Sequence, residues 1–363
     1  MRAPVFVHGA TGFTGRLVCA ALRERGVPFA IGGRSAARLD ALAAELGGVE
    51  RQVVDITDAG SIRAALDGRT IVCACAGPFG AIGEPVLASS ARAGVHYVDT
   101  TGEQGFVALA ASRYRATAEA SGACIVPAMA FEIAPGDWAA HAAAELLGGG
   151  VDAVDVAYVS FGASGAGATT RGTKLSALSV IGDGDAKQYV AGALVREPAG
   201  EVVRTFTTAR GETVHAVSFP SPEAVVVPAH TRAKTVRAFM AAGRGSASAF
   251  HVARGVAPAI ARVARPIVER LVAWTPEGPV GDARTGQFEV VAEARKGERT
   301  ARVSVTGRDP YGLTGAIQAI AAQRAVAGKI TARGVLAPSQ IIAPRDACAE
   351  LAAFELTIHP HVA

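Results

Sequence analysis

Short apolar runs alternate with stretches of helical periodicity over the first 130 residues of the chain. Helices are expected near residues 13–26, 35–47, 59–67, 82–93 and 105–120. The apolar runs between them are predicted strands: Val5–His8, Phe29–Gly33, Glu50–Val54, Ile71–Ala76, His96–Asp99 and Ala123–Pro127. Strands that alternate with helices of this length predict a parallel sheet with helices on both faces.

The pattern changes after Pro127. Helices are expected at 137–147, 247–273 and 315–327, and 345–358 is expected to form a helix followed by a short strand. Further strands are expected at 151–161, 201–207, 213–219, 224–228, 285–295 and 299–307. The last two strands predict a hairpin around Lys296 and Gly297. The predicted fold class is therefore α/β: a doubly wound domain at 1–130, and a second, α+β domain at 131–311 with a mostly antiparallel sheet. We expect 312–363 to pack back on the first domain.

Composition limits the class of protein. Half of the 363 residues are hydrophobic and 19% are charged, so a large core is expected and a mainly disordered chain is excluded. A net charge of +4 is mild at this length and predicts no nucleic-acid binding. The mean hydropathy of +0.29 raises the question of a membrane span. No window of about 18 residues lacks charge, which argues against a spanning helix.

Cysteine usage and the first residues bear on the compartment. The five cysteines are an odd number with scattered spacing, which favours reduced thiols over disulfides or a metal site. The first residues lack the apolar run and cleavage site of a signal peptide. We therefore expect a cytoplasmic protein.

A glycine-rich turn follows the first predicted strand. Gly9, Gly12 and Gly15 have the GxxGxxG spacing, and the turn opens the first predicted helix. In such a turn the glycines permit a sharp bend, close approach of a pyrophosphate and close packing of the helix. After the first of six alternating strands, this turn is typical of the Rossmann fold and predicts a dinucleotide site that also includes Thr11, Phe13 and Thr14. A glycine-rich turn without ligand is the alternative.

The end of the second strand indicates which dinucleotide is bound. NAD-preferring enzymes usually carry Asp or Glu here, and this chain has Gly32-Gly33-Arg34-Ser35 instead. Arg34, Ser35 and Arg38 suit the 2′-phosphate of NADP, so NADPH is the predicted cofactor. A solvated Arg34 is the alternative. Asp55, after the third strand, is a candidate for the adenine edge, and a plain strand-end acid is equally compatible.

The fourth strand leads into Ala76-Gly77-Pro78-Phe79. Loops at the carboxyl ends of Rossmann strands border the nicotinamide. We therefore expect the Gly77 and Pro78 backbone near the cofactor and Phe79 beside its ring. An ordinary turn is the alternative.

Several motifs together resemble the saccharopine dehydrogenase-like NADP-binding superfamily, in the branch that includes bacterial trans-acting enoyl reductases. They are the segments 8–15, 32–35, 76–79, 97–103, 130–137, 170–173, 308–312 and 334–338. The resemblance implies an NADPH-dependent reductase, and a homodimer because the superfamily often forms one. Members reduce C=N bonds in saccharopine reductases and C=C bonds in enoyl reductases. The chain departs from the family pattern at Ala130-Phe131-Glu132 and Gly307–Tyr311, where substrate contacts are expected.

Hydride transfer often needs a proton donor at the other end of the reduced bond. None of the five tyrosines has Lys four residues later, which excludes the Tyr–Lys pair of short-chain dehydrogenases. Candidates for catalysis or substrate binding lie in loops expected to face the cofactor: Tyr97, Glu103, Glu132, Arg171 and Tyr311. Glu103 could instead cap the helix at 105, Asp137 could cap the helix that follows it, and Arg171 could lie in a solvated loop.

The remaining signals concern partners. No histidine pair has metal-ligand spacing with a carboxylate of the HExxH kind, so no metal is predicted. Arg254, Arg262 and Arg265 share one arc of about 80° on the predicted helix 247–273. Two interpretations are open. In the first, the helix is amphipathic and covers the second domain; in the second, its arginines bind an acidic acyl-carrier protein or a membrane surface.

Three functions follow from these observations. The first is NADPH-dependent reduction of an activated C=C bond in a small-molecule or carrier-bound acyl substrate. The second is a saccharopine reductase-like reduction of C=N. The third is an NADPH-binding scaffold or sensor without catalysis.

Overall fold

In the computed structural model, the described residues are 2–160, 186–243 and 286–362, with scattered positions between 245 and 278. Contacts divide the chain into two compact units. The first comprises Met1–Thr101, Gly105–Glu132 and Tyr311–Ile342, and the second Gly102–Gln104, Ile133–Pro310 and Ala343–Ala363.

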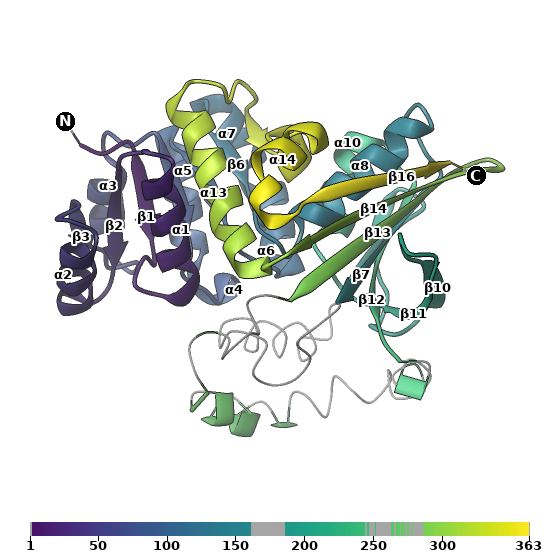
Figure 1. Cartoon of the computed structure of the whole chain (residues 1–363). Helices are drawn as coiled ribbons and strands as arrows, with labels where there is room; N and C mark the ends of the chain where they lie inside the picture. Colours follow the sequence, from purple (N-terminus) through teal and green to yellow (C-terminus); the bar gives the residue numbers. More distant parts are fainter. Residues whose placement is uncertain are drawn as a thin grey trace. The chain divides into compact units, whose positions relative to one another are not determined.

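Within the described residues, the first unit is built on a seven-stranded parallel sheet of order β15-β6-β5-β4-β1-β2-β3 (Figure 1). The order reverses between β1 and β4, which lie side by side, and ligands of such sheets bind outside the carboxyl ends of the strands at this point. The strands are β1 (Val5–His8), β2 (Phe29–Gly33), β3 (Arg51–Val53), β4 (Ile71–Ala74), β5 (His96–Asp99), β6 (Cys124–Val126) and β15 (Gly334–Val335).

Helices cover both faces of this sheet. On one face α1 (Phe13–Glu24) packs against α13 (Pro310–Val326), where a Cβ on Gly315 would lie 2.9 Å from the Leu17 carbonyl oxygen. The other face carries an apolar cluster, formed with α3 (Ala59–Leu66), α5 (Glu84–Ala93) and α7 (Arg115–Ser121). The remaining helical segments are α2 (Ala36–Glu45), α4 (Phe79–Ile82), α6 (Gln104–Leu109) and a π-helical turn at Ala110–Tyr114.

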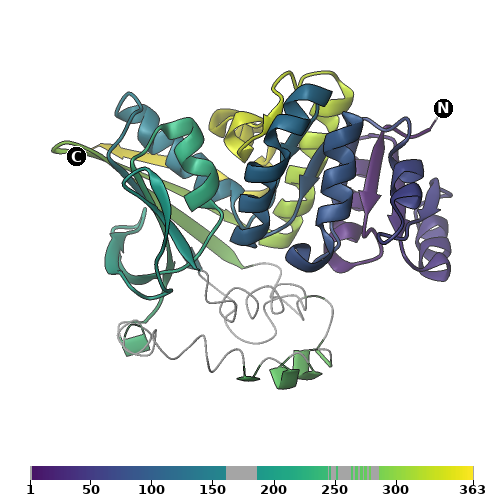
Figure 2. The same ribbon diagram turned by 180° about the vertical axis from the view of Figure 1, so that it is seen from behind.

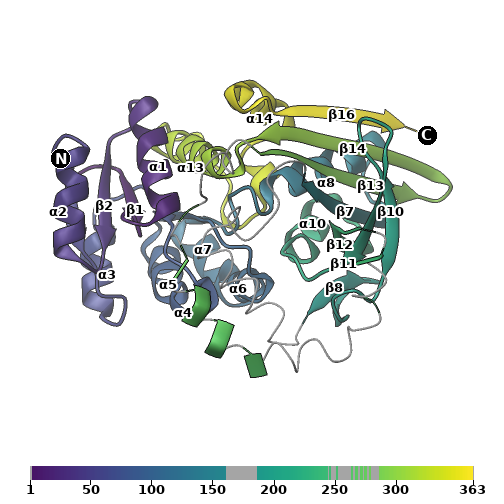
Figure 3. The same cartoon turned by 60° about the horizontal axis from the view of Figure 1, so that its bottom comes forward.

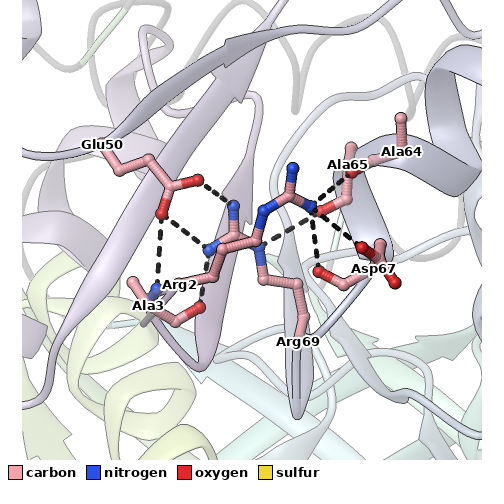
Figure 4. A network of polar contacts seen from close by, with 7 residues as sticks. All are labelled: Arg2, Ala3, Glu50, Ala64, Ala65, Asp67 and Arg69. Atoms are coloured by element: carbon pink, nitrogen blue, oxygen red, sulfur yellow. Dashed lines mark hydrogen bonds and ion pairs between the residues drawn. The ribbon is translucent and has the colours of Figure 1, made fainter.

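An ion pair fixes the amino ends of the strands (Figure 4). The Arg69 guanidinium is fully buried and donates to both carboxylate oxygens of Glu50 and to the Ala3 carbonyl. These hydrogen bonds hold the pKa of Glu50 below its usual value. Arg2 reaches the Ala64 and Asp67 carbonyls of the neighbouring α3 segment. The network lies at the edge opposite the carboxyl ends and therefore serves stability.

The second unit contains, within the described residues, a nine-stranded sheet of order β10-β11-β12-β7-β13-β14-β16, with β8 on β12 and β9 on β8. The β7–β12 pair is parallel and the other pairs are antiparallel. The strands are β7 (Ala153–Ser160), β8 (Lys187–Val190), β9 (Ala193–Arg196), β10 (Val203–Thr207), β11 (Thr213–Ser218), β12 (Thr235–Ala241), β13 (Gln287–Lys296), β14 (Arg299–Arg308) and β16 (Thr357–Val362). The predicted fold class is confirmed, including the hairpin at Lys296 and Gly297.

Two adjacent helices, α8 (Ala134–Leu146) and α10 (Glu223–Thr231), pack against this sheet (Figures 2 and 3). The prediction of a strand at 224–228 is wrong, because this valine-rich run forms α10 and buries Val226 and Val227. The strands β8, β9 and β12 were not predicted. Most of the predicted helix 247–273 lies outside the described residues.

The end of the chain is divided between the two units. We expected 312–363 to pack on the first domain, and residues to Ile342 do lie in the first unit, where β15 extends the parallel sheet. The last residues, with α14 (Pro344–Glu350), belong to the second unit because β16 pairs with β14. In the part of the chain that the structure describes, no helix has the length and apolarity of a membrane span.

Candidate functional site

The turn between β1 and α1 is held against the neighbouring strands by its own backbone. The Gly9 N–H donates to the Gly32 carbonyl at 2.8 Å, and Gly9 adopts a φ of +80°. A Cβ at Gly9 would lie 2.8 Å from the Ala76 nitrogen, in the loop after β4. Glycine is therefore required here by both conformation and space.

The other two glycines differ in what surrounds them. A Cβ at Gly15 would lie 2.7 Å from the Ala10 Cα, so α1 packs directly on the turn. Gly12 is the N-cap of α1, and a Cβ there would meet only the Gly9 carbonyl oxygen, at 3.4 Å, among the described atoms. The first turn of α1, which includes Phe13 and Thr14, leaves backbone N–H groups without intrahelical acceptors at the positive end of the helix. This open cradle fits a pyrophosphate.

The second strand brings two arginines to the same turn. Arg34 is exposed directly after β2, and the Arg38 guanidinium donates to the Thr11 carbonyl at 3.0 Å. The Ser35 hydroxyl accepts the Arg38 N–H at 3.4 Å and caps α2. Two cationic side chains therefore follow the strand at which the adenosine ribose is expected.

Asp55 has a local structural contact. Its Oδ1 accepts the Thr57 hydroxyl at 2.7 Å and the Thr57 N–H at 2.9 Å. These hydrogen bonds hold the pKa of the exposed carboxylate below its usual value. The contact is that of a strand-end acid in a turn, and an adenine contact stays a prediction.

The loop after β4 exposes its backbone to solvent, whereas the Phe79 ring is buried. Ala76 and Gly77 retain solvent exposure, whereas Phe79 is 5% exposed and packs against Phe106 with 5.6 Å between ring centroids. Pro78 is the N-cap of α4. The Phe79 ring therefore lies in the core, and its contact with the nicotinamide stays a prediction.

Tyr97 lies on the face of the sheet that α5 and α7 cover. The side chain is fully buried in the apolar cluster beneath these helices. Burial and the neighbouring Asp99 carboxylate raise the pKa of Tyr97 well above its usual value. Its role as a catalytic residue stays a prediction.

The carboxyl ends of β5 and β6 are joined by buried polar contacts. Asp99 Oδ1 accepts the Thr101 N–H at 2.9 Å and the Ala128 N–H at 2.8 Å. Gln318 of α13 donates to the Asp99 and Met129 carbonyls, each at 2.8 Å. Sequence reasoning missed this frame, since its donors and acceptors are far apart along the chain.

Glu132 ends the loop that this frame supports. Its Oε2 atom is buried and has no hydrogen-bond partner among the described residues. Burial raises the pKa of Glu132 to about 7, and the charge of Asp99 adds to the rise. The preceding N–H, of Phe131, donates to the Thr314 hydroxyl at 3.1 Å.

The other three candidates have different locations. Tyr311 lies in the first unit, where its ring meets Phe13 of the glycine-rich turn edge to face, with centroids 5.5 Å apart. Glu103 is buried directly before α6, in the short segment that groups with the second unit. Arg171 lies outside the described residues, as do Arg254, Arg262 and Arg265.

The second unit holds a buried polar cluster that sequence reasoning missed. His230 Nε2 lies 2.6 Å from Asp137 Oδ1, and its Nδ1 lies 3.2 Å from His141 Nδ1. Glu223 accepts hydrogen bonds from Tyr158 and Ser221, and burial raises its pKa to about 7. The N-cap alternative for Asp137 is wrong, because α8 begins at Ala134 and the carboxylate binds His230. Among the residues described, no group of three or more His, Cys, Asp or Glu has a metal-site arrangement.

A protein-family model described as NAD(P)H-binding matches residues 9–147. The match begins at the first glycine of the turn. The chain therefore carries an NAD(P)H-binding domain.

Curated relatives match part of the chain. The trans-acting enoyl reductase of Mycobacterium leprae (strain TN) is 33% identical over 139 residues, which are 37% of this chain and 33% of that protein. The trans-acting enoyl reductase of Mycobacterium ulcerans (strain Agy99) is 32% identical over 143 residues, 38% of this chain and 34% of that protein. The matched segment thus spans about one third of these relatives.

One solved structure matches the whole chain. Apo saccharopine dehydrogenase (L-Glu forming) from Saccharomyces cerevisiae is matched over 99% of both chains with a TM-score of 0.61 and 14% sequence identity. The chain therefore has the fold of saccharopine dehydrogenase. Both resemblances inferred from the sequence are confirmed. The solved structure confirms the saccharopine dehydrogenase-like fold, and the curated relatives confirm the similarity to trans-acting enoyl reductases.

Proposed function

We propose that the chain is an NADPH-dependent reductase of an activated C=C bond in a small-molecule or carrier-bound acyl substrate. The observation that carries this proposal is the turn at Gly9, Gly12 and Gly15, which closes on its own backbone and leaves Gly12 open at the start of α1. When bound, NADPH supplies a hydride. The first turn of α1 would hold its pyrophosphate, and the loop at Ala76 and Gly77 would border its ring.

The preference for NADPH is supported by charge. Arg34 and Arg38 follow β2, and no carboxylate stands at the end of that strand to bind a ribose 2′-hydroxyl. A guanidinium forms charge-assisted hydrogen bonds to a phosphate. Arg38 also holds the Thr11 carbonyl, so it supports the turn whichever dinucleotide is bound.

The C=C bond is supported by the relatives named as enoyl reductases. The C=N alternative is supported by the fold of saccharopine dehydrogenase. Saccharopine-type substrates carry several carboxylates, for which Arg171 is the proposed anchor. The two reactions differ in the substrate and in the bond that is reduced, so activity assays with the two kinds of substrate distinguish them.

The test combines binding with turnover. NADPH and NADH are titrated by fluorescence, and oxidation of NADPH at 340 nm is then followed with 2-enoyl thioesters and with imines formed from an amino acid and an aldehyde. We expect tighter binding of NADPH and oxidation with an enoyl thioester. Oxidation with imines alone would favour the second reaction. Binding without oxidation against either group would favour a scaffold or sensor.

A further inference from the structure

Glu132 of the first unit is half-buried, and its carboxyl oxygen Oε2 is fully buried without a hydrogen-bond partner among the described residues. Glu132 follows β6, which pairs with β5, and β5 in turn pairs with β4. A buried carboxyl oxygen without a hydrogen-bond partner is costly, so a fold seldom keeps one without a function. The place of Glu132, after the carboxyl end of a strand of the parallel sheet, is that of a substrate group.

The loop that carries Glu132 is held on several sides. Ala128 adopts a φ of +58° while its N–H binds Asp99, and Gln318 binds the carbonyl of Met129. The Phe131 N–H then binds Thr314. The backbone on the N-terminal side of Glu132 is therefore fixed to β5 and α13, and its carboxyl group needs little reorganisation to act.

The charged surroundings favour a neutral carboxyl group. Among the described residues, the titratable group that acts on Glu132 is Asp99, at the end of β5. Tyr97 and Cys75 lie beyond Asp99 and interact with it rather than with Glu132. The α13 side chains that bind the backbone of this loop, Thr314 and Gln318, are uncharged. Burial raises the pKa of Glu132, a backbone hydrogen bond partly opposes this rise and Asp99 adds to it, so the group keeps its proton below about pH 7.

We propose that Glu132 is the general acid of the reduction, an inference that rests on the proposed reductase function. Hydride adds to the β-carbon of the enoyl thioester, and the electron pair of the C=C bond moves toward the α-carbon. Glu132 donates its proton to that α-carbon and becomes a carboxylate. Water then returns the proton. The products are the saturated thioester and NADP⁺, so atoms and electrons balance.

The main variants are Glu132→Gln, which keeps the shape and removes the acid, and Glu132→Asp, which keeps the acid. Glu24→Gln, an exposed site at the end of α1, is the matched control. We expect Glu132→Gln to lower kcat at least 100-fold with unchanged NADPH affinity and melting temperature at pH 6 to 7. Glu132→Asp should recover part of kcat. In the wild type, kcat should fall as the pH rises through about 7.

A measurement without substrate or cofactor keeps the two proposals separate. Infrared difference spectra of wild type minus Glu132→Gln should show a protonated carboxyl band that disappears near pH 7. A band that disappears below pH 5 would overturn the role of Glu132, as would a Glu132→Gln variant with the wild-type kcat and pH profile. If the band titrates near pH 7 but none of the substrates tested supports oxidation of NADPH, the reductase function is refuted instead.

Discussion

Two alanine substitutions in the glycine-rich turn should separate folding from cofactor binding. At Gly15 the added Cβ meets backbone on the Gly9–Ala10 side, 2.7 Å from the Ala10 Cα, where no flexible side chain can yield. At Gly12 the added Cβ meets only the Gly9 oxygen, at 3.4 Å, among the described atoms. The two positions are three residues apart in the same turn, so each is a control for the other.

The magnitudes follow from these contacts. Overpacking costs about 1–3 kcal/mol, and the rigid surroundings of Gly15 favour the upper end. The higher helix propensity of alanine offsets about 1 kcal/mol of this cost. The free energy of unfolding of Gly15→Ala should therefore fall by about 2 kcal/mol, and its Tm by about 4–8 °C. At Gly12, alanine is a poorer N-cap than glycine and lowers the free energy of unfolding by up to about 1 kcal/mol. Alanine also reduces the entropy of the unfolded chain, which offsets about 0.4–1 kcal/mol of that loss. Stability should therefore hardly change.

Affinity is expected to behave differently. Gly12→Ala places a methyl group where the pyrophosphate approaches the helix, and should weaken NADPH binding at least tenfold, or about 1.4 kcal/mol. Gly15→Ala should lose both stability and affinity. Gly105→Ala is the neutral control, because nothing lies within 4 Å of its Cβ position.

The assays are thermal unfolding followed by circular dichroism and NADPH titration by fluorescence. A Gly12→Ala variant that binds NADPH like the wild type would refute the placement of the pyrophosphate. A Gly15→Ala variant with unchanged Tm would refute the packing of α1 on the turn.

Three further predictions concern single groups. Arg34→Ala should weaken NADPH binding at least tenfold in isothermal titration and leave NADH binding unchanged, because one charge-assisted contact to phosphate contributes about 1.5–3 kcal/mol; equal losses would contradict the 2′-phosphate assignment. Gln318→Leu should lower the free energy of unfolding by about 2–3 kcal/mol in urea titrations, because it leaves two buried carbonyls without their donor. Burial lowers the pKa of His230, but the charge and hydrogen bond of Asp137 outweigh burial and raise that pKa above 6.5. The pair therefore stabilises the fold most below pH 6.5, and less as the pH rises through the pKa of the folded state. The advantage of wild type over Asp137→Asn should thus be larger at pH 5.5 than at pH 8, and a constant advantage would refute this linkage.

The parallel sheet could be predicted because its central strands are buried. Val5–His8, Phe29–Gly33 and His96–Asp99 have the predicted bounds, since each is a short run of mainly buried residues between predicted helices or turns. The second unit was less predictable. The run at 224–228 has a strand-like composition, and packing against α8 makes it a helix, so tertiary contacts override local preference.

The glycine-rich turn could also be predicted, because spacing and context define it. Side-chain direction could not. Tyr97 and Phe79 are on elements that border the expected site, and both rings point into the core. The frame around Asp99 depends on Gln318, which is 219 positions away along the chain. No local pattern reveals such a contact.

Isotope transfer tests the central claim most directly. The protein is incubated with NADPH deuterated at C4, in separate reactions for the two faces of the ring, and with a 2-enoyl thioester, and the products are examined by mass spectrometry and NMR. The proposed reductase function predicts a saturated thioester with one deuterium at the β-carbon, from one of the two labelled forms. A protein that binds NADPH and transfers no deuterium to any enoyl or imine substrate would contradict it.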